Sequence, residues 1–268
     1  MSLASLAPLE SPAPLVYITG ASSGIGQALA LRYYQAGWRL ALVARRAAEM
    51  QQWAQAEGLS ADRWAVYGAD VSEIDSITAA GRQCMAAQGL PDVVIANAGI
   101  SIGIDTAIFS DLAVMQRLYA TNNIGMAATF HPFLAAMNQR GRGCLVGVAS
   151  VAGIRGLPGH AAYCSSKAAV ISYCESLRGE CRPHGVHVLT LVPGYIDTPL
   201  TQKNRYGMPF LMSPERFADK AFEAIAQRAR FQVIPWQMGW VARLLRLLPD
   251  ALFDRLLAGR PRKHRQDE

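Results

Sequence analysis

A tyrosine and a lysine four residues apart, Tyr163 and Lys167, form a pair with a specific chemical potential. The segment around them has helical apolar spacing, so both side chains should lie on one helix face. An ammonium beside a phenol favours the phenolate, and we expect it to lower the tyrosine pKa from roughly 10 towards the working pH. Ser150 lies upstream, across a Gly/Pro loop that can fold it back. The three residues predict a proton donor, its electrostatic tuner and a carbonyl-polarising hydroxyl, although Y-x-x-x-K also occurs by chance on exposed helices.

Length and composition limit the class of protein that positions this pair. The 268 residues are 51% hydrophobic and 17% charged, which fits a globular fold with a sizeable core. The five cysteines are odd in number and include no C-x-x-C pair, so we expect a reducing cytoplasm, no disulfide framework and no metal site. No uncharged apolar run reaches the roughly 18 residues of a membrane span. Residues 1–12 lack the pattern of a secretory signal and are expected to form a loose N-terminal arm.

A glycine-rich turn follows the first apolar run. Residues 15–19 predict a buried strand, and a helical pattern begins at Gln27. Glycines between a strand and a helix allow tight turning and close approach of a pyrophosphate, which the amides at the helix N-terminus can bind. This context predicts a dinucleotide site rather than a mere tight turn. The turn residues expected to bind the cofactor are Gly20, Ser22, Ser23, Gly24, Ile25 and Gly26.

The residues after the second predicted strand, 38–44, indicate which dinucleotide binds. Arg45 and Arg46 stand where an acidic residue would hold the ribose 2′-hydroxyl of NAD. Arginine at that point accommodates the 2′-phosphate of NADP, and no acidic residue competes before Glu49. NADP is therefore favoured over NAD, the alternative being that both arginines belong to a solvated helix start.

Further small and polar residues follow the other predicted strands. Asp70 and Val71 follow the third strand, where Asp70 is placed either to meet an adenine amino group or to cap and solvate the surface. Ser72 is the expected N-cap of the next helix. The fourth strand, residues 93–96, and the sixth, residues 186–192, end in segments that permit close approach of a cofactor. Their candidate residues are Asn97, Ala98, Gly99, Pro193, Gly194, Ile196 and Thr198.

Strands and helices alternate throughout residues 13–235 without an internal boundary. This alternation predicts one domain of the α/β class, a single Rossmann-type doubly wound parallel sheet of about seven strands with helices on both faces. All the polar motifs then fall at the carboxyl ends of strands, whereas chance matches would scatter. Asn122 lies between two helical stretches, where its low helix propensity indicates a bend with a bound water.

In these motifs the chain resembles a short-chain dehydrogenase/reductase over roughly residues 13–235. Ser150 precedes Tyr163 by the family's thirteen residues, whereas Ala96 and Ala149 depart from the family's common Asn and Ser at positions without chemistry. The segments that carry the resemblance are TGASSGIG (19–26), NAG (97–99), N-x-x-G (122–125), Y-C-S-S-K (163–167) and PGYIDT (193–198).

The resemblance implies an NADP(H)-dependent oxidoreductase that interconverts a carbonyl and a secondary alcohol. Tyr163 would be the general acid or base, and Lys167 would lower its pKa and bind the nicotinamide ribose. Ser150 would polarise the substrate carbonyl, and Asn122 would hold a water that connects Lys167 to solvent. The resemblance also implies a homodimer or homotetramer.

The substrate pocket is expected between residues 102–104, 154–159 and 195–211, which are mostly apolar. A lipid, steroid-like or aromatic carbonyl compound would suit such walls, although apolar walls are usual in binding sites. Lys203 and Arg205 are placed either to meet an acidic group or to form a solvated loop. The candidate contacts are Tyr195, Tyr206, Met208, Phe210 and Met212.

Residues 236–268 form a predicted C-terminal extension, amphipathic and helical, with a basic, disordered end. Much of the net charge of +6 lies after Ala229, and we expect no nucleic-acid partner. The helices should pack on their own domain or on a partner subunit, or else contact an anionic membrane surface through residues 236–257. Their expected apolar stripes are Trp240, Val241, Leu244, Leu245 and Leu248, and then Leu252, Phe253, Leu256 and Leu257.

Three functions are thus compatible with the sequence. The first is the cytoplasmic NADP(H)-dependent oxidoreductase acting on a fairly apolar small molecule. The second is a non-catalytic NADP-binding sensor or scaffold, against which the filled Ser150, Tyr163, Lys167 and Asn122 positions argue. The third, a membrane-peripheral lipid-modifying reductase, rests on the C-terminal extension alone.

Overall fold

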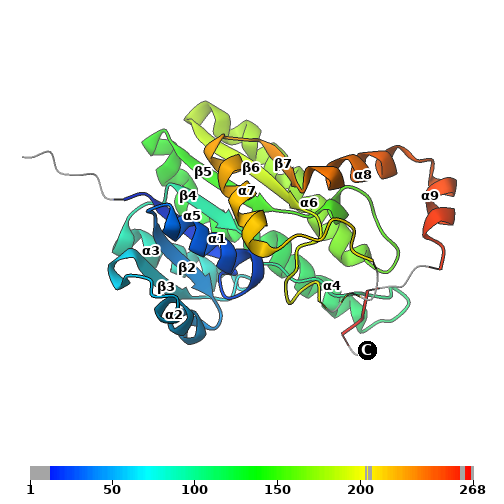
Figure 1. The fold of residues 1–268 in the computed structure, drawn as a ribbon, viewed down its shortest axis with the longest axis horizontal. Helices are drawn as coiled ribbons and strands as arrows, with labels where there is room; N and C mark the ends of the chain where they lie inside the picture. The colour runs from blue at the N-terminus through cyan, green and yellow to red at the C-terminus, as the bar shows by residue number, and fades with distance from the viewer. Residues whose placement is uncertain (1–12, 203, 205–206, 260–262, 267–268) are drawn as a thin grey trace, which may run out of the picture.

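A seven-stranded parallel sheet forms the centre of the computed structural model, which describes residues 13–202, 204, 207–259 and 263–266. The strand order is β3-β2-β1-β4-β5-β6-β7, and every pairing is parallel (Figure 1). The predicted fold class is confirmed. The strands are β1 (Leu15–Thr19), β2 (Arg39–Ala44), β3 (Trp64–Gly68), β4 (Val93–Ala96), β5 (Gly143–Val148), β6 (Val186–Pro193) and β7 (Phe231–Ile234).

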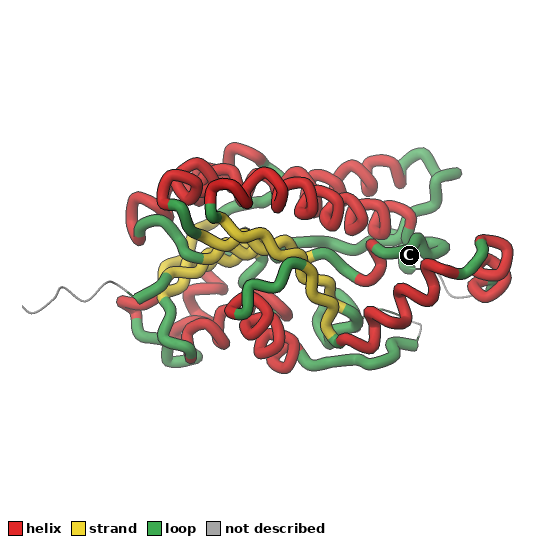
Figure 2. The backbone as a smooth tube through the Cα atoms, turned by 90° about the horizontal axis from the view of Figure 1, so that it is seen from above, coloured by secondary structure: helices red, strands yellow, loops and turns green. Residues whose placement is uncertain are grey.

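Helices cover both faces of the sheet, as Figure 2 shows. Parallel strands buried on both faces need continuous apolar sequence, and all five residues of β1 are buried. Tyr17 of β1 packs edge-on against Phe133 on one face, with ring centroids 4.8 Å apart. Its neighbours Val16 and Ile18 belong to the core of the opposite face. The helices are α1 (Gly24–Gln35), α2 (Ala47–Ala56), α3 (Ile74–Gln88), α4 (Asp111–Tyr119), α5 (Gly125–Arg140), α6 (Ala161–Cys181), α7 (Pro214–Ala226), α8 (Trp236–Leu247) and α9 (Asp250–Leu257).

The start of α3 differs from the prediction. Glu73 occupies the N-cap position, and no side chain caps the helix. Ser72 instead donates from its amide and its hydroxyl to Asp70 Oδ1, at 2.9 and 2.7 Å. The carboxylate is the stronger acceptor, so Ser72 closes a tight turn after β3 and the predicted N-cap is wrong.

The C-terminal helices α8 and α9 pack on the domain with a different face from the one predicted. The inward side chains of α8 include Met238 and Ala242, whereas Trp240 and Leu244 are 58% and 63% exposed. In α9 the buried residues are Phe253 and Leu257. The expected stripe on α8 was wrong for Trp240 and Leu244, because β7 and the loop after β5 meet the side of the helix that holds the smaller residues.

The basic C-terminal end is expected to be disordered, but its described residues, 263–266, make specific contacts. His264 accepts a hydrogen bond at its carbonyl oxygen from the amide of Gly103, at 2.7 Å. Arg265 pairs with Asp111 through two contacts of 2.7 and 3.0 Å. Residues 263–266 therefore lie bound to the α/β domain through Gly103 and Asp111. The predicted N-terminal arm, residues 1–12, lies outside the described residues.

Among the described helices, none combines the length and the apolar character needed to cross a membrane.

Candidate active site

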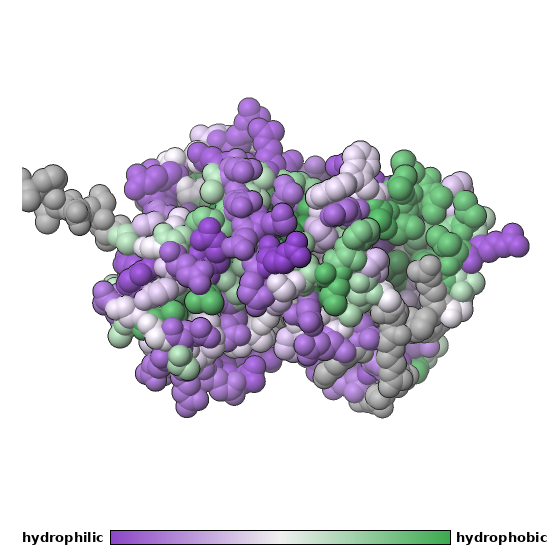
Figure 3. All heavy atoms as spheres, in the orientation of Figure 1, coloured by the Kyte–Doolittle hydropathy of each residue, from purple (hydrophilic) through white to green (hydrophobic). Residues whose placement is uncertain are grey.

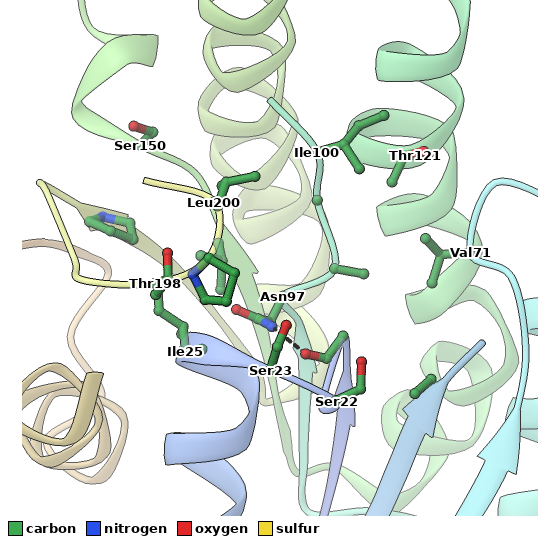
Figure 4. A pocket seen from close by; sticks show the side chains of 18 of the residues that line it. Ser22, Ser23, Ile25, Val71, Asn97, Ile100, Thr121, Ser150, Thr198 and Leu200 are labelled. Atoms are coloured by element: carbon green, nitrogen blue, oxygen red, sulfur yellow. Dashed lines mark hydrogen bonds between the residues drawn. The ribbon is translucent and has the colours of Figure 1, made fainter. Parts of the chain in front are cut away.

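A cleft of about 560 Å³ opens at the carboxyl ends of the central strands (Figure 4). Most of the sequence-predicted site residues meet there, although they come from the ends of six different strands and from helix α6. Gly26 and Asn122 do not line the cleft. Both contact residues that do, Gly26 at the Gly20 carbonyl oxygen and Asn122 at the amide of Ile100. The predicted residues on the wall are Gly20, Ser22, Ser23, Gly24, Ile25, Arg45, Arg46, Asp70, Val71, Asn97, Ala98, Gly99, Ser150, Tyr163, Lys167, Pro193, Gly194, Ile196 and Thr198.

The glycine turn between β1 and α1 is too crowded for side chains at key positions. Gly20 has a φ of +67°, which favours glycine. A Cβ on Gly26 would lie 2.1 Å from the Gly20 carbonyl oxygen, so α1 can approach the turn closely only without one. Asn97 Nδ2 donates to the carbonyl oxygens of Thr19, at 3.0 Å, and Gly20, at 3.3 Å. The predicted tie between neighbouring strands through Asn97 is present.

The N-terminus of α1 faces this cleft without a competing side chain. Ser23 occupies the N-cap position but makes no side-chain capping hydrogen bond, and the first turn of α1 has no acidic residue. Ser22 and Ser23 of the turn and Ile25 of the first turn of α1 lie at the cleft (Figure 4). Free amides and the positive end of the helix dipole suit an anion such as pyrophosphate.

Arg45 and Arg46 lie at the cleft beyond the end of β2. Arg45 Nη1 is 3.7 Å from Asp70 Oδ2, and Arg46 Nη1 is 3.0 Å from Glu49 Oε2. Burial alone would raise the pKa of Asp70, but hydrogen bonds from Ser72 and the charge of Arg45 hold it below its usual value. Both guanidinium groups are more than half exposed, so their ion pairs are weak and leave them available to an anionic ligand.

The tyrosine, lysine and serine converge as predicted. Tyr163 and Lys167 lie on α6, and Ser150 lies two residues after the end of β5. Lys167 is buried, and its Nζ donates to the carbonyl oxygen of Val148 at 2.9 Å. The same Nζ lies 6.0 Å from the centroid of the Tyr163 ring. Ser150 Oγ accepts a hydrogen bond from Ala152 N at 3.2 Å, which orients the hydroxyl at the start of its loop.

The electrostatics of this trio differ from the expectation. Burial raises the pKa of Tyr163 to about 12, although its hydrogen bond with Ser150 opposes the shift. Burial also lowers the pKa of Lys167 to about 8. Desolvation disfavours the charged form of each group. The expected lowering of the tyrosine pKa is therefore not produced by the protein's own groups, because the ammonium that was to cause it is itself desolvated.

Asn122 sits in a π-helical turn, Ala120–Ile124, between α4 and α5. Its Oδ1 accepts from Ile100 N at 2.9 Å, and its Nδ2 donates to Ile100 O at 3.0 Å and to Ser166 Oγ at 2.9 Å. A Cβ on Gly99 would lie 3.2 Å from Asn122 Oδ1 and 3.3 Å from Lys167 Nζ. The asparagine therefore explains the bend by fastening the loop after β4 to α6, and its role in holding a water stays a prediction.

A second cavity, of about 710 Å³, adjoins the cleft. Ser150 and Tyr163 line both spaces. The walls of the cavity are mainly apolar, and its outer side comes from the C-terminal extension, beyond the three segments that the sequence predicts for the substrate pocket. The extension residues on its wall are Met238, Val241, Ala242, Leu245, Leu256, Leu257 and Lys263.

Comparison with known proteins identifies the chain. The model of the short chain dehydrogenase family matches residues 14–208. This protein belongs to the short-chain dehydrogenase/reductase family. An uncharacterized oxidoreductase of Myxococcus xanthus is 38% identical over 240 residues, which cover 88% of this chain and 93% of the relative.

Two solved structures have the same fold. A short-chain dehydrogenase of Sphingobium yanoikuyae in complex with NADPH has a TM-score of 0.72 and 24% identity, covering 89% of this chain and 97% of that one. A short-chain dehydrogenase/reductase of Burkholderia phymatum in complex with NAD has a TM-score of 0.78 and 22% identity, covering 93% and 96%. The first of these neighbours is bound to NADPH and the second to NAD, and both share the fold of this chain.

The predicted substrate pocket of this dehydrogenase/reductase is only partly present. Tyr195 lines the cavity as expected, together with residues of the loop after Ser150. Phe210 is instead half exposed, and Met212 is buried in the core beside β6. Ile102 lies in the cofactor cleft and Ile104 in a separate apolar cluster. Met208 is not on the cavity wall, and Lys203, Arg205 and Tyr206 lie outside the described residues.

Arg155 holds the outer wall of the second cavity in place. Its guanidinium donates to the carbonyl oxygens of Leu245 and, at 2.7 Å, Leu248, and to Asp250 Oδ1 at 3.0 Å. It also lies over the ring of Phe253, 3.8 Å from the centroid. One side chain from the loop after Ser150 thus bonds the end of α8 and the start of α9.

Several cleft residues were missed in the sequence. Ile100, Thr121 and Leu200 point into the cleft in Figure 4, and Arg117 also lines it. Thr121 directly precedes Asn122, and Leu200 lies inside the segment 195–211 that was predicted for the substrate side, so proximity to those predictions was the available signal. Arg117 of α4 carries no such signal, and its placement depends on how α4 packs.

Proposed function

We propose that this protein is an NADP(H)-dependent oxidoreductase that interconverts a carbonyl and a secondary alcohol on a largely apolar substrate. The observation that carries the proposal is the position of Ser150 and Tyr163, which line both the cofactor cleft and the apolar cavity. A reacting carbonyl at this junction would meet a hydroxyl and a phenol on one side and a nicotinamide site on the other.

The cleft has the features that a dinucleotide needs. The turn excludes a Cβ at Gly26, the first amides of α1 have no side-chain cap, and Gly99 adjoins Lys167 without a side chain of its own. These features fit the pyrophosphate at residues 20–26 and the nicotinamide end near Lys167. When bound, the cofactor supplies or accepts the hydride, and the protein supplies placement and electrostatics.

The catalytic residues would act on the oxygen of the reacting group. In carbonyl reduction, the Ser150 hydroxyl donates a hydrogen bond to the carbonyl oxygen and Tyr163 transfers its proton to that oxygen. Because its pKa is raised, the phenol of Tyr163 carries its proton at neutral pH and is in the protonated form that a general acid requires. In alcohol oxidation the Tyr163 phenolate would accept the proton of the alcohol. In both directions Lys167 would stabilise the phenolate form of Tyr163.

Arg45 and Arg46 support NADP over NAD. Both lie on the cleft wall after β2, and the nearby carboxylates of Asp70 and Glu49 are each already paired with an arginine. A 2′-phosphate would provide the two guanidinium groups with a stronger charged partner. The preference itself is a proposal, because a nicotinamide cofactor of either kind fits the family.

The direct test is to incubate the protein with NADPH and each of a panel of apolar ketones, and to measure the loss of NADPH absorbance. With any ketone that is reduced, Tyr163→Phe should lower kcat/KM by about 10²–10⁴-fold, while NADPH binding measured by fluorescence stays unchanged. Tyr173→Phe, on the same helix and partly exposed, is the matched control and should keep full activity. Retention of most activity in Tyr163→Phe would disprove the assignment, and tight NADPH binding without turnover of any ketone would favour the sensor or scaffold.

Peripheral membrane contact is a second proposal, supported by one specific observation. Large apolar side chains gather on the outer surface of α8 and α9, where Figure 3 shows a hydrophobic area. Exposed arginines Arg243, Arg246 and Arg255 lie on the same helices, which suits an anionic surface. The exposed apolar residues are Trp236, Trp240, Leu244, Leu247, Leu252 and Leu256.

Co-sedimentation with vesicles containing anionic lipid tests this contact. Trp240→Ser should weaken binding, whereas Phe109→Ser, which is 88% exposed elsewhere on the molecule, should not. Equal recovery with neutral and anionic vesicles, or no recovery at all, would remove the proposal. The homodimer or homotetramer and the cytoplasmic location stay predictions.

A further inference from the structure

Lys263 places an amine on the wall of the apolar substrate cavity. Its Nζ donates to Asn204 Oδ1 at 2.8 Å, and within the described part of the chain this neutral amide is its only hydrogen-bonding partner. Burial lowers the pKa of Lys263. A half-buried ammonium that pairs with no carboxylate of the described residues has lost hydration that an anionic ligand would replace.

The other described basic side chains on this wall, Arg155 and His160, do not offer an unpaired positive charge. Arg155 is bonded to Asp250 and to two backbone carbonyl oxygens at the end of α8. His160 is buried, and burial is the main cause that lowers the pKa of its imidazole, which favours the neutral form. Of the described basic groups on this wall, Lys263 is therefore the one with a positive charge not matched by an acidic partner.

The position of Lys263 is fixed by its neighbours rather than by the amine itself. The carbonyl oxygen of the next residue, His264, accepts from Gly103 N at 2.7 Å. A Cβ on Gly103 would lie 2.2 Å from the carbonyl oxygen of Lys263, so the tail lies tightly against the loop after β4. Arg265 is held by the buried carboxylate of Asp111. These contacts hold the backbone of Lys263 beside the cavity, and its side chain forms part of the cavity wall.

We propose that the natural substrate carries a carboxylate on an apolar body and that Lys263 binds this carboxylate while Ser150 and Tyr163 hold the carbonyl. The inference rests on the proposed oxidoreductase function and adds the substrate class. A single ammonium matches the single charge of a carboxylate, whereas a phosphate dianion would require a second cation. The apolar walls accommodate the chain between the two polar ends. The substrate class is an apolar keto acid, or the corresponding hydroxy acid in the oxidative direction.

Steady-state kinetics with a matched pair of substrates test the proposal. The pair is a linear medium-chain keto acid with its ketone near the far end of the chain, and the methyl ester of the same acid. Wild-type protein should reduce the acid with the lower KM. Lys263→Met should raise KM for the acid roughly ten- to a hundredfold, the range expected for a hydrogen bond between charged groups. Its kcat, and its KM for the ester, should change little.

Two further variants distinguish binding from folding. Lys220→Met, in exposed α7, is the matched control and should leave both substrates unaffected. Lys263→Glu should reverse the charge preference, so that a ketone ending in a primary amine becomes better than the keto acid. Equal use of acid and ester by the wild type, or an equal rise in KM for both in Lys263→Met, would overturn the inference while leaving the oxidoreductase function intact. A failure of the proposed function would instead appear as no reduction of any ketone, or as full activity in Tyr163→Phe.

Discussion

The cofactor cleft and the substrate cavity share Ser150 and Tyr163, yet they are built in different ways. The cleft is formed by the ends of buried parallel strands, whose register fixes each loop. The outer wall of the cavity is formed by α8, α9 and Lys263. The two helices lie beyond the sheet (Figure 1) and depend on a few contacts such as those of Arg155. Cofactor binding should therefore tolerate changes in the C-terminal extension, and substrate choice should respond to them.

The largest expected effect comes from Gly26→Ala, which should damage the cleft and spare the cavity. The added Cβ would lie 2.1 Å from the Gly20 carbonyl oxygen and 2.7 Å from Asn97 Nδ2. The turn must move, so we expect NADPH binding to be lost and the free energy of unfolding to fall by about 1–3 kcal/mol. Fluorescence titration and urea unfolding measure the two effects.

Gly179→Ala is the control for this prediction, because a Cβ there meets nothing within 4 Å. Replacing a helical glycine by alanine should stabilise the protein by about 0.5–1 kcal/mol. Normal NADPH affinity in Gly26→Ala would show that the turn does not bind the pyrophosphate.

Lys167 should make stability depend on pH through the cleft. Its pKa is about 8 when folded and 10.5 when unfolded, so the unfolded chain binds more protons between these values. Buried cysteines with raised pKa values titrate in the same range and have the opposite effect on stability. The Lys167 contribution is therefore the difference in the free energy of unfolding between wild type and Lys167→Met, which should rise with pH between about 8 and 10 by up to about 3 kcal/mol, since each pKa unit corresponds to about 1.4 kcal/mol. Urea unfolding of both proteins across this pH range measures the difference.

The cavity offers a counterpart to that measurement. Lys263 also has a lowered pKa, but it is only half-buried, so Lys263→Met should change the pH dependence of stability less than Lys167→Met does. An identical slope in wild type and Lys167→Met would contradict the burial of a charged lysine in the cleft.

Arg155→Ala should affect the cavity and spare the cleft. The change removes the hydrogen bonds to Leu248 O and Asp250 and the contact with the Phe253 ring. We expect a loss of about 2 kcal/mol in the free energy of unfolding, because the bonds involve a charged donor. KM for ketones should rise while the Kd for NADPH stays constant.

Arg243→Ala, at an exposed position of α8, is the matched control for Arg155→Ala. If Arg155→Ala weakened NADPH binding as much as ketone binding, the two regions would not be separable and the comparison would fail.

The same division explains what the sequence could predict. The glycine turn, the Tyr163–Lys167 pair and the strands are encoded within short segments, so pattern and spacing identify them. The cavity wall depends on contacts such as Arg155 with Leu248, which are 93 residues apart and have no local signature. The raised pKa of Tyr163 was missed for a related reason, because burial is a property of the packed molecule and not of the spacing between two residues.

The smallest expected effect concerns the 2′-phosphate. Arg45→Ala should lower the affinity for NADPH by roughly tenfold, about 1.4 kcal/mol, because an exposed guanidinium contributes less than a buried one. The affinity for NADH should not change. Arg46→Ala should have a similar or smaller effect, since Arg46 also pairs with Glu49. Equal losses for NADPH and NADH would remove the arginines from the choice of cofactor.

The bonding of Arg155 also bears on how this protein can be recombined with its relatives. Residues 236–257 could serve as an exchangeable cassette for altering the range of compounds accepted, because they contribute no strand to the sheet. However, the cassette is attached through a residue more than eighty positions upstream of it. A chimera that exchanges α8 and α9 therefore has to exchange position 155 with them. Otherwise the transferred helices lack the side chain that bonds them to the α/β domain.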